Sequence, residues 1–186
     1  MLNADSVAAA AFIFTGLFAG ATALFSLLST PERLTVMEKL PRRRLPGFII
    51  GQIALLMCVP HAAVVAPAFL LPWLLPLALI VPWLAVFFVD YAFSRAFGGM
   101  IILLAYETVH RSFELDLPGG KIITVAAWIF GIFGIWLSGY PPFLRDIIRK
   151  SAGVRRWRYG ISGAALLLSG IFFYAAAAAI VLRNWR

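Results

Sequence analysis

The stretch AFGGMIILLAYETVH, residues 96–110, decides how many times this chain crosses a membrane. It is largely apolar, but it carries the carboxylate of Glu107 and has only 15 residues. A helix needs roughly 20 residues to cross a bilayer core of about 30 Å. A helix lying flat on the membrane surface is therefore the alternative to a fourth span. The distribution of charge in the rest of the chain distinguishes the two.

Five other segments are long and apolar enough to be transmembrane helices. Of the 186 residues, 62% are hydrophobic and 13% are charged, whereas about a quarter of the residues of an ordinary soluble domain are charged. The nearly uncharged segments are residues 6–29, 47–67, 70–89, 121–140 and 160–182. No interval between them is long enough for a soluble core. The sequence therefore predicts an all-α integral membrane protein with one polytopic domain over residues 1–186.

The positive charges indicate that residues 96–110 also cross the membrane. Lys and Arg are concentrated in two connections, residues 30–46 and 141–159. Short loops rich in these residues stay in the cytoplasm, so an even number of crossings must separate the two connections. Three clear spans lie between them, and 96–110 supplies the fourth. We predict a six-helix transmembrane bundle in a plasma (inner) membrane, with a short fourth span, both termini outside and both basic loops cytoplasmic.

The first segment is interpreted as a retained span and not as a signal peptide. The sequence MLNADS carries Asp5 and no basic residue, and the apolar stretch that follows runs for 24 residues. A signal peptide begins with basic residues and has an apolar core of roughly 7–15 residues. The single Cys58 excludes a disulfide within the chain.

The basic connections are expected to lie on an anionic inner leaflet. Each combines basic residues with apolar residues at helical spacing, and each basic side chain near such a surface contributes about 1 kcal/mol. The predicted contacts with lipid headgroups are Arg42, Arg43, Arg44, Arg155, Arg156 and Arg158. Simple anchoring explains this pattern, and specific docking of a lipid or a partner is the alternative. We do not interpret the net charge of +8 as a nucleic-acid footprint.

Small residues mark faces on which helices approach one another closely. Gly16 and Gly20 form a GxxxG pair in the first span, and Ala165 and Ser169 form a similar pair in the last span. Such pairs let helix backbones come close together in lipid. Packing inside the bundle is the simpler interpretation, and a homo-oligomer or a partner membrane subunit is the alternative.

Prolines crowd the second and third spans, at positions 60, 67, 72, 76 and 82. Proline removes a backbone hydrogen bond and kinks or breaks a helix, so we expect the helices near residues 60–82 to be interrupted. Irregular backbone at membrane depth is tolerated only where protein or a water-filled cavity covers it. The prolines therefore favour a transport pathway.

Four ionisable or metal-ligating residues lie inside the predicted spans, where such residues are functional by default. Cys58 and His61 are three residues apart in span two, and Glu107 and His110 are three residues apart in span four. Counted from the inner face, the two pairs lie at matching depths of roughly 16–22 Å. We therefore predict a candidate intramembrane polar site made of these four residues.

The same pattern has simpler explanations. His61 follows Pro60, which leaves a backbone carbonyl free for the imidazole or a water, and Glu107 is placed to pair with Arg111 at i, i+4. A substrate or proton pathway is a second interpretation. A metal or haem site is a third, because Cys58, His61, Glu107 and His110 are workable ligands and two histidines suffice for bis-imidazole ligation of haem b. At the inner end of span four, Asp90 and Arg95 are expected to form an ion pair.

No catalytic motif appears in the sequence. There is no H-E-x-x-H, G-x-S-x-G, P-loop or glycine-rich dinucleotide motif, so catalytic residues are not predicted and no cofactor is expected. The leading hypothesis is a non-catalytic multi-pass membrane protein, either a small permease or a membrane subunit of a larger complex. A metal- or haem-binding redox protein is the first alternative. A lipid-headgroup-modifying enzyme is the second, because the arginines and Asp90 lie at headgroup level.

Overall fold

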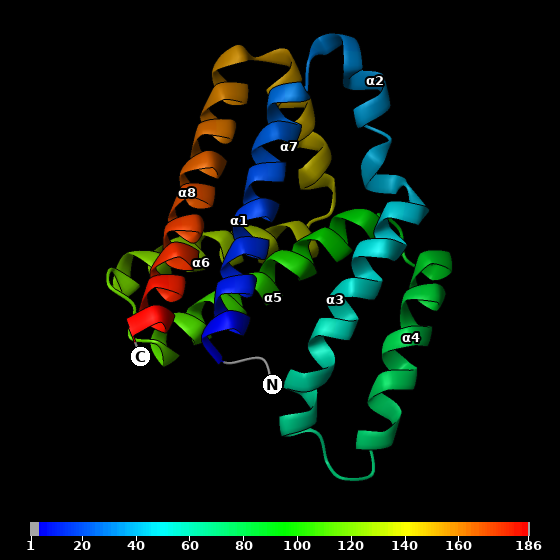
Figure 1. The fold of residues 1–186 in the computed structure, drawn as a ribbon. Coiled ribbons are helices and arrows are strands. Elements are labelled where there is room, and N and C mark those ends of the chain that lie inside the picture. The colour runs from blue at the N-terminus through cyan, green and yellow to red at the C-terminus, as the bar shows by residue number, and fades with distance from the viewer. Residues whose placement is uncertain (1–3, 186) are drawn as a thin grey trace.

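The computed structural model describes residues 4–185 as an assembly of helices (Figure 1). Six long helices are α1 (Ala4–Leu28), α3 (Arg44–Val65), α4 (Leu71–Phe88), α5 (Ala92–Glu114), α6 (Gly120–Gly139) and α8 (Arg155–Trp185). A seventh, α7, spans Pro142–Gly153. Between α1 and α3 lie the short turns η1 (Pro31–Arg33), α2 (Leu34–Met37) and η2 (Leu40–Arg42). The six long helices each meet the length and hydropathy of a membrane span, so the predicted six-helix fold is confirmed.

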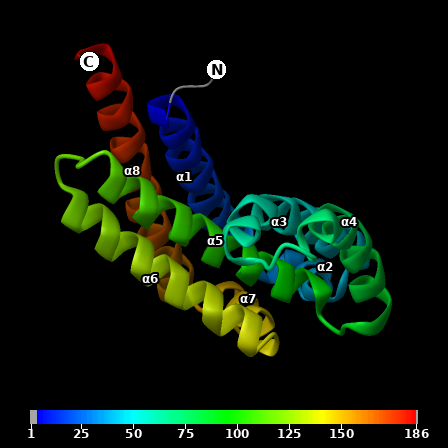
Figure 2. The same cartoon turned by 90° about the horizontal axis from the view of Figure 1, so that it is seen from below.

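The long helices pack as three antiparallel pairs, α1 with α8, α5 with α6, and α3 with α4. Helix α5 joins the pairs because it contacts α3 on one side and α6 and α1 on the other. Helix α4 packs mainly against α3, and the α3–α4 hairpin projects from the rest of the molecule (Figure 2). Only 11% of the apolar window of α4 is buried, against 50% for α5. Helix α5 is therefore the centre of the fold.

Two glycines set the distance between α5 and α6. A β-carbon added to Gly98 would lie 2.6 Å from the carbonyl oxygen of Gly134, and one added to Gly134 would lie 2.8 Å from that of Gly98. Only glycine permits such a backbone approach, which small residues provide between membrane helices. The fully buried Ile101 and Leu137 pack beside this crossing.

Small residues likewise join α1 to α8. The hydroxyl of Ser169 donates a hydrogen bond of 2.8 Å to the carbonyl oxygen of Gly16, and Gly20 faces the same serine. The ring of Phe173 lies against Gly16. Packing inside the chain therefore accounts for the GxxxG pair of the first span.

Replacing Ser169 with alanine is expected to destabilise the protein by about 0.5–1.5 kcal/mol. The substitution removes an interhelical hydrogen bond between buried groups, and such bonds in membrane proteins contribute amounts of this size. The measurement is the free energy of unfolding in detergent micelles. Ser162→Ala is the matched control, because the Ser162 hydroxyl donates within its own helix to Arg158. An equal cost for both variants would contradict a role of Ser169 in joining α1 to α8.

Two details of the predicted fold are corrected. The fourth span is not short, since α5 has 23 residues. The helix extends past residues 96–110 at both ends. The polar residues in these two extensions do not stop the helix, because they are either paired or exposed. The helices near residues 60–82 are also not interrupted at each proline. Pro60 lies inside α3, and Pro76 and Pro82 lie inside α4. Between residues 60 and 82 the helix breaks only over residues 66–70. Membrane helices tolerate a single proline where a neighbouring helix satisfies the carbonyl that it frees, and Gln52 of α3 donates to the carbonyl of Ala78, four residues before Pro82.

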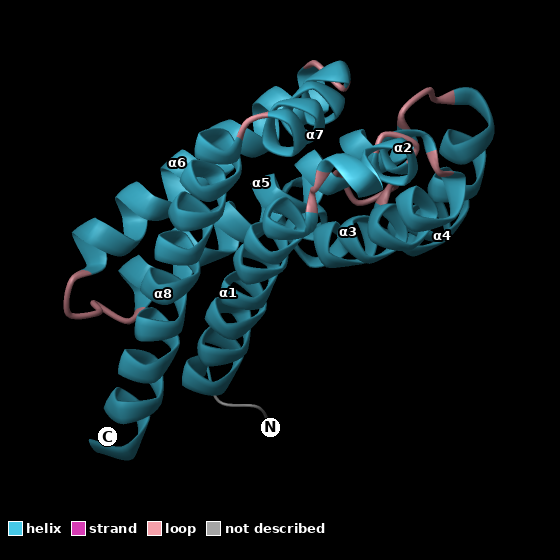
Figure 3. Ribbon diagram, turned by 90° about the horizontal axis from the view of Figure 1, so that it is seen from above, coloured by secondary structure: helices cyan, strands magenta, loops and turns pink. Residues whose placement is uncertain are grey.

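The two basic connections gather at one end of the molecule, where α2 and α7 lie side by side (Figure 3). Helix α7 buries Leu144 and Ile148 and exposes Arg149 and Lys150. An ion pair joins Arg149 to Glu38. The hydrogen bond that Arg149 donates to Glu38 lowers the pKa of the Glu38 carboxyl. The start of α1 and the end of α8 lie at the opposite end, as the predicted topology requires.

Candidate functional site

The predicted contact between spans two and four is present, because α3 packs directly against α5. It brings the imidazole of His61 to the carboxylate of Glu107, with 3.3 Å between Nε2 and Oε2. Glu107 is buried at 8% exposure, whereas the side chain of His61 remains 33% exposed. A buried carboxylate thus meets an imidazole on a neighbouring helix.

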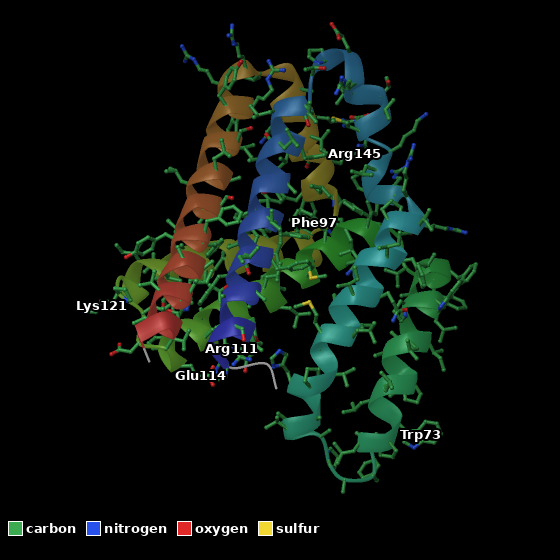
Figure 4. The ribbon with its side chains drawn as sticks, in the orientation of Figure 1. Trp73, Phe97, Arg111, Glu114, Lys121 and Arg145 are labelled. Atoms are coloured by element: carbon green, nitrogen blue, oxygen red, sulfur yellow. The ribbon has the colours of Figure 1, made fainter. Side chains whose placement is uncertain are left out.

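Arg111 holds the other oxygen of the same carboxylate. Its Nε donates to Oε1 of Glu107 over 2.9 Å, and its Nη1 donates to Glu114 over 2.7 Å. Arg111 and Glu114 lie at the end of α5 that is remote from Arg145 of α7 (Figure 4). The four residues therefore form a chain of ionisable groups that leads from the α3–α5 contact to one end of the molecule.

The Glu107–His61 contact is close but is not a hydrogen bond. Oε2 of Glu107 is within ion-pair distance of the imidazole, yet it has no hydrogen-bond partner in the part of the chain that the structure describes. A buried carboxylate oxygen without a hydrogen-bond partner costs stability. Oε2 of Glu107 is therefore the unsatisfied atom in the row of ionisable groups formed by His61, Glu107, Arg111 and Glu114.

The other two predicted residues do not join this contact. The ring of Tyr106 lies between the histidines, edge-on to His61 at 5.2 Å and stacked on the exposed His110 at 6.0 Å. Cys58 faces cavities between α3, α4 and α5. Among residues 4–185, no three His, Cys, Asp or Glu side chains are gathered closely enough to hold a metal ion. The donor set of the metal alternative is therefore not assembled.

A groove of about 360 Å³ runs between α3, α4 and α5, and we call it the α3–α4–α5 groove. Its walls are mainly small and apolar, and Arg95 is the one charged residue among the described residues that line it. It is lined by Gly47, Gly51, Ala54, Leu55, Cys58, Pro82, Ala85, Val86, Val89, Ala92, Arg95, Ala96, Gly99 and Leu103. Cys58 and Leu103 form one end of it, and His61 and Glu107 follow them by one helical turn. The groove therefore ends beside the His61–Glu107 contact.

The predicted ion pair of Asp90 and Arg95 is not formed in the described part of the chain. Arg95 instead donates to the carbonyl oxygen of Ser138 over 3.4 Å. Both residues are exposed, and solvated charges gain little by pairing. The prediction of this ion pair was wrong because the chain turns between the two residues. Tyr91, which lies between them in sequence, takes a left-handed backbone conformation with φ of 57° just before α5 starts.

Arg42 approaches this turn. It donates a hydrogen bond of 2.8 Å to the hydroxyl of Tyr91, and this bond lowers the pKa of that phenol. Arg42, Arg44, Asp90 and Tyr91 share a surface pocket of about 380 Å³. The remaining predicted headgroup contacts are exposed except Arg158, which is half-buried, and Arg155 and Arg158 lie against the ring of Tyr159. Contact of these arginines with lipid headgroups stays a prediction.

Two features of the site escaped the sequence analysis. One is Tyr106, whose ring lies between the two histidines. The other is a buried pair of hydroxyls, Thr15 on α1 and Thr108 on α5, which are 3.2 Å apart. Thr15 donates to its own helix at Ala11, so Thr108 donates to Thr15. The position of Thr108 next to Glu107 in the sequence could have drawn attention to it. Its partner Thr15 on α1 could not be predicted, because the two residues are 93 positions apart in the chain.

Comparison with known protein families, curated proteins and solved structures finds no match for this chain. The six apolar helices identify it as a multi-pass membrane protein.

Proposed function

We propose that the protein is a small permease in which the α3–α4–α5 groove is part of the solute pathway. The observation that carries this proposal is the buried Glu107 at the end of the groove, held by Arg111 and facing His61. Ionisable residues inside membrane helices mark ion and substrate pathways, including proton relays. The proposal assigns His61 and Glu107 to a proton-sensitive gate.

The dimensions of α5 support a pathway across the membrane. The groove reaches Arg95 near the start of this helix, and the chain of ionisable groups reaches Glu114 at its end. The 19 steps of helix from Arg95 to Glu114 rise about 28 Å, close to the thickness of a bilayer core. Groove and ionisable chain together follow nearly the whole span.

The chemistry of the contact supports sensitivity to protons. Glu107 faces His61 of α3, while Arg111 and Tyr106 lie beside it on α5. Protonation of His61 places a second cation against the carboxylate and strengthens the α3–α5 contact, since opposite charges attract strongly where water is excluded. Loss of that proton, or protonation of Glu107, weakens the contact. The end of the groove would then open or close with proton binding.

The test is the charge displaced by a pH step in proteoliposomes on a solid-supported membrane, which needs no known solute. The wild-type protein is expected to give a transient current above that of empty liposomes, because a proton that reaches Glu107 moves within the membrane field. Glu107→Gln should reduce this current by about tenfold, and His61→Gln should reduce it severalfold. Asp116→Asn is the matched control, because it neutralises an exposed carboxylate near the same end of α5. A wild-type current equal to that of empty liposomes would overturn the proposal.

The orientation in the membrane is proposed from the positive charges, with α2 and α7 in the cytoplasm. Single cysteines are introduced in a Cys58→Ser background at the exposed positions Val36, Asp116 and Gly153. An impermeant thiol reagent added outside whole cells is expected to label position 116 and to leave 36 and 153 unlabelled until the cells are broken. Labelling of 36 and 153 from outside would reverse the orientation.

A membrane subunit of a larger complex is the second candidate, and the α3–α4 hairpin favours it. Helix α4 packs mainly against α3 and leaves most of its surface uncovered by the chain. Light scattering after size exclusion in mild detergent distinguishes the two candidates. A protein mass near 20.4 kDa fits a permease that acts alone, and co-purification of a stoichiometric partner from native membranes fits a subunit.

A further inference from the structure

A second cavity lies beneath α7, at the end of the molecule that carries the basic connections. It has a volume of about 230 Å³ and is lined by residues of α1, α5, α6, α7, α8 and η2. We call it the α7 cavity. The residues of α5 that line it, Phe93 and Phe97, do not line the α3–α4–α5 groove. The cavity is therefore a separate site.

The walls of the α7 cavity are mainly apolar, and phenylalanine is the commonest residue among them. Five phenylalanines line it, namely Phe18, Phe25, Phe93, Phe97 and Phe133. No charged residue of the described chain is among the residues that line it. Burying a charge without a partner is costly, so the walls select against ions. They favour a neutral ligand with an apolar ring.

Four hydroxyls also line the cavity, and one of them has no partner. Thr22 donates to the carbonyl of Ala19, Ser29 to that of Phe25 and Ser26 to that of Arg158. Ser151 is buried at 1% exposure, and its Oγ makes no hydrogen bond within the described chain.

The difference between Ser151 and the other three hydroxyls of the cavity indicates a ligand. Hydroxyls on helices usually bond to a carbonyl three or four residues earlier, as Thr22 and Ser29 do here. The Ser151 hydroxyl is left free beside an apolar cavity, where an unmade hydrogen bond is costly. A ligand oxygen in the cavity would satisfy it.

We propose that the α7 cavity binds a neutral, single-ring lipophile with one hydroxyl or carbonyl oxygen, and that Ser151 hydrogen-bonds this oxygen. A dry apolar cavity of about 150 Å³ is large enough for benzene. The 230 Å³ of this cavity therefore holds a ring with a short alkyl substituent. Such a molecule dissolves in the membrane and reaches the site from the lipid.

The probes that test this site are 4-propylphenol and propylbenzene, which differ only in the hydroxyl. Binding is measured by titration calorimetry on the full chain in lipid nanodiscs, after subtraction of the partitioning into empty nanodiscs. We expect saturable binding of 4-propylphenol, roughly three- to tenfold tighter than that of propylbenzene, because the hydroxyl adds one hydrogen bond. Absence of saturable binding for both probes would overturn the proposal.

Variants of Ser151 test the role of its hydroxyl. Ser151→Ala should remove the preference for the phenol and keep the binding of propylbenzene. It should not lower thermal stability in the absence of probe, since the lost hydroxyl has no hydrogen-bond partner in the part of the chain that the structure describes. Ser162→Ala is the matched control, because Ser162 is a buried serine that bonds within its own helix. It should leave both affinities unchanged. Unaltered phenol preference in Ser151→Ala would show that another group recognises the phenol hydroxyl, and would overturn the role assigned to Ser151.

Photolabelling locates the probe independently of affinity. A phenol that carries a diazirine is expected to label residues of α1 or α7 that line the cavity, and 4-propylphenol should compete with this labelling. Ser151→Met, which fills the cavity from the same position, should abolish the labelling. Labelling confined to the lipid-facing surface of α4 and insensitive to competition would contradict a site in the α7 cavity.

Discussion

Replacing Gly98 with alanine is expected to destabilise the protein by about 2–3 kcal/mol or to prevent its folding. The new β-carbon would lie 2.6 Å from the carbonyl oxygen of Gly134 and 2.7 Å from the amide nitrogen of Ser138. Both atoms belong to the backbone of α6, so no side-chain rotation relieves the clash and the two helices must separate. Overpacking in a well-packed core typically costs 1–3 kcal/mol, and backbone clashes lie at the upper end.

Gly99 is the matched control for this prediction. A β-carbon there meets nothing within 4 Å, and alanine stabilises the interior of a helix relative to glycine by up to about 1 kcal/mol. Gly99→Ala is therefore expected to leave stability unchanged or to raise it slightly. The measurement is reversible unfolding in detergent micelles, followed by tryptophan fluorescence. Equal stability of the two variants would show that the α5–α6 crossing is looser than the structure has it.

Replacing Arg111 with glutamine is expected to cost about 2–3 kcal/mol. The change leaves the buried carboxylate of Glu107 with only the imidazole of His61 near it. Breaking a buried pair by removing one partner costs about 3–5 kcal/mol, and the partial exposure of Arg111 reduces this figure. Glu107→Gln should cost less, because Arg111 keeps its ion pair with Glu114. The double variant should resemble Glu107→Gln, since no unpaired carboxylate remains.

The control for the network is Glu114→Gln. The Glu114 side chain is 45% exposed, and exposed ion pairs contribute about 0–1 kcal/mol, so the change should be small. A second double-mutant cycle, with His61→Ala and Glu107→Ala, is expected to be non-additive, because residues in contact couple by about 0.5–3 kcal/mol. Additive costs in both cycles would mean that His61, Glu107 and Arg111 do not act as one network.

Part of the candidate site followed from the sequence alone. The depths of His61 and Glu107 depend only on helical rise and on the positions of the span ends, so their proximity was predictable once α3 and α5 were assumed to be neighbours. The pairing of Glu107 with Arg111 follows from their i, i+4 spacing. The outward direction of His110 did not follow, because the face that a helix turns to its neighbours is set by contacts along its whole length.

The sequence by itself determined the class of the protein, the number of spans and their relative orientation. Hydrophobic length and the positions of Lys and Arg are properties of segments, and the bilayer responds to them without reference to the rest of the fold. The tertiary structure alone decided that Gly98 meets Gly134 and that Arg95 bonds Ser138. It also decided that Ser151 lies beside a cavity without a hydrogen-bond partner among the described residues. Each of these depends on which helices become neighbours and at what rotation. That choice results from many weak contacts between residues far apart in the chain.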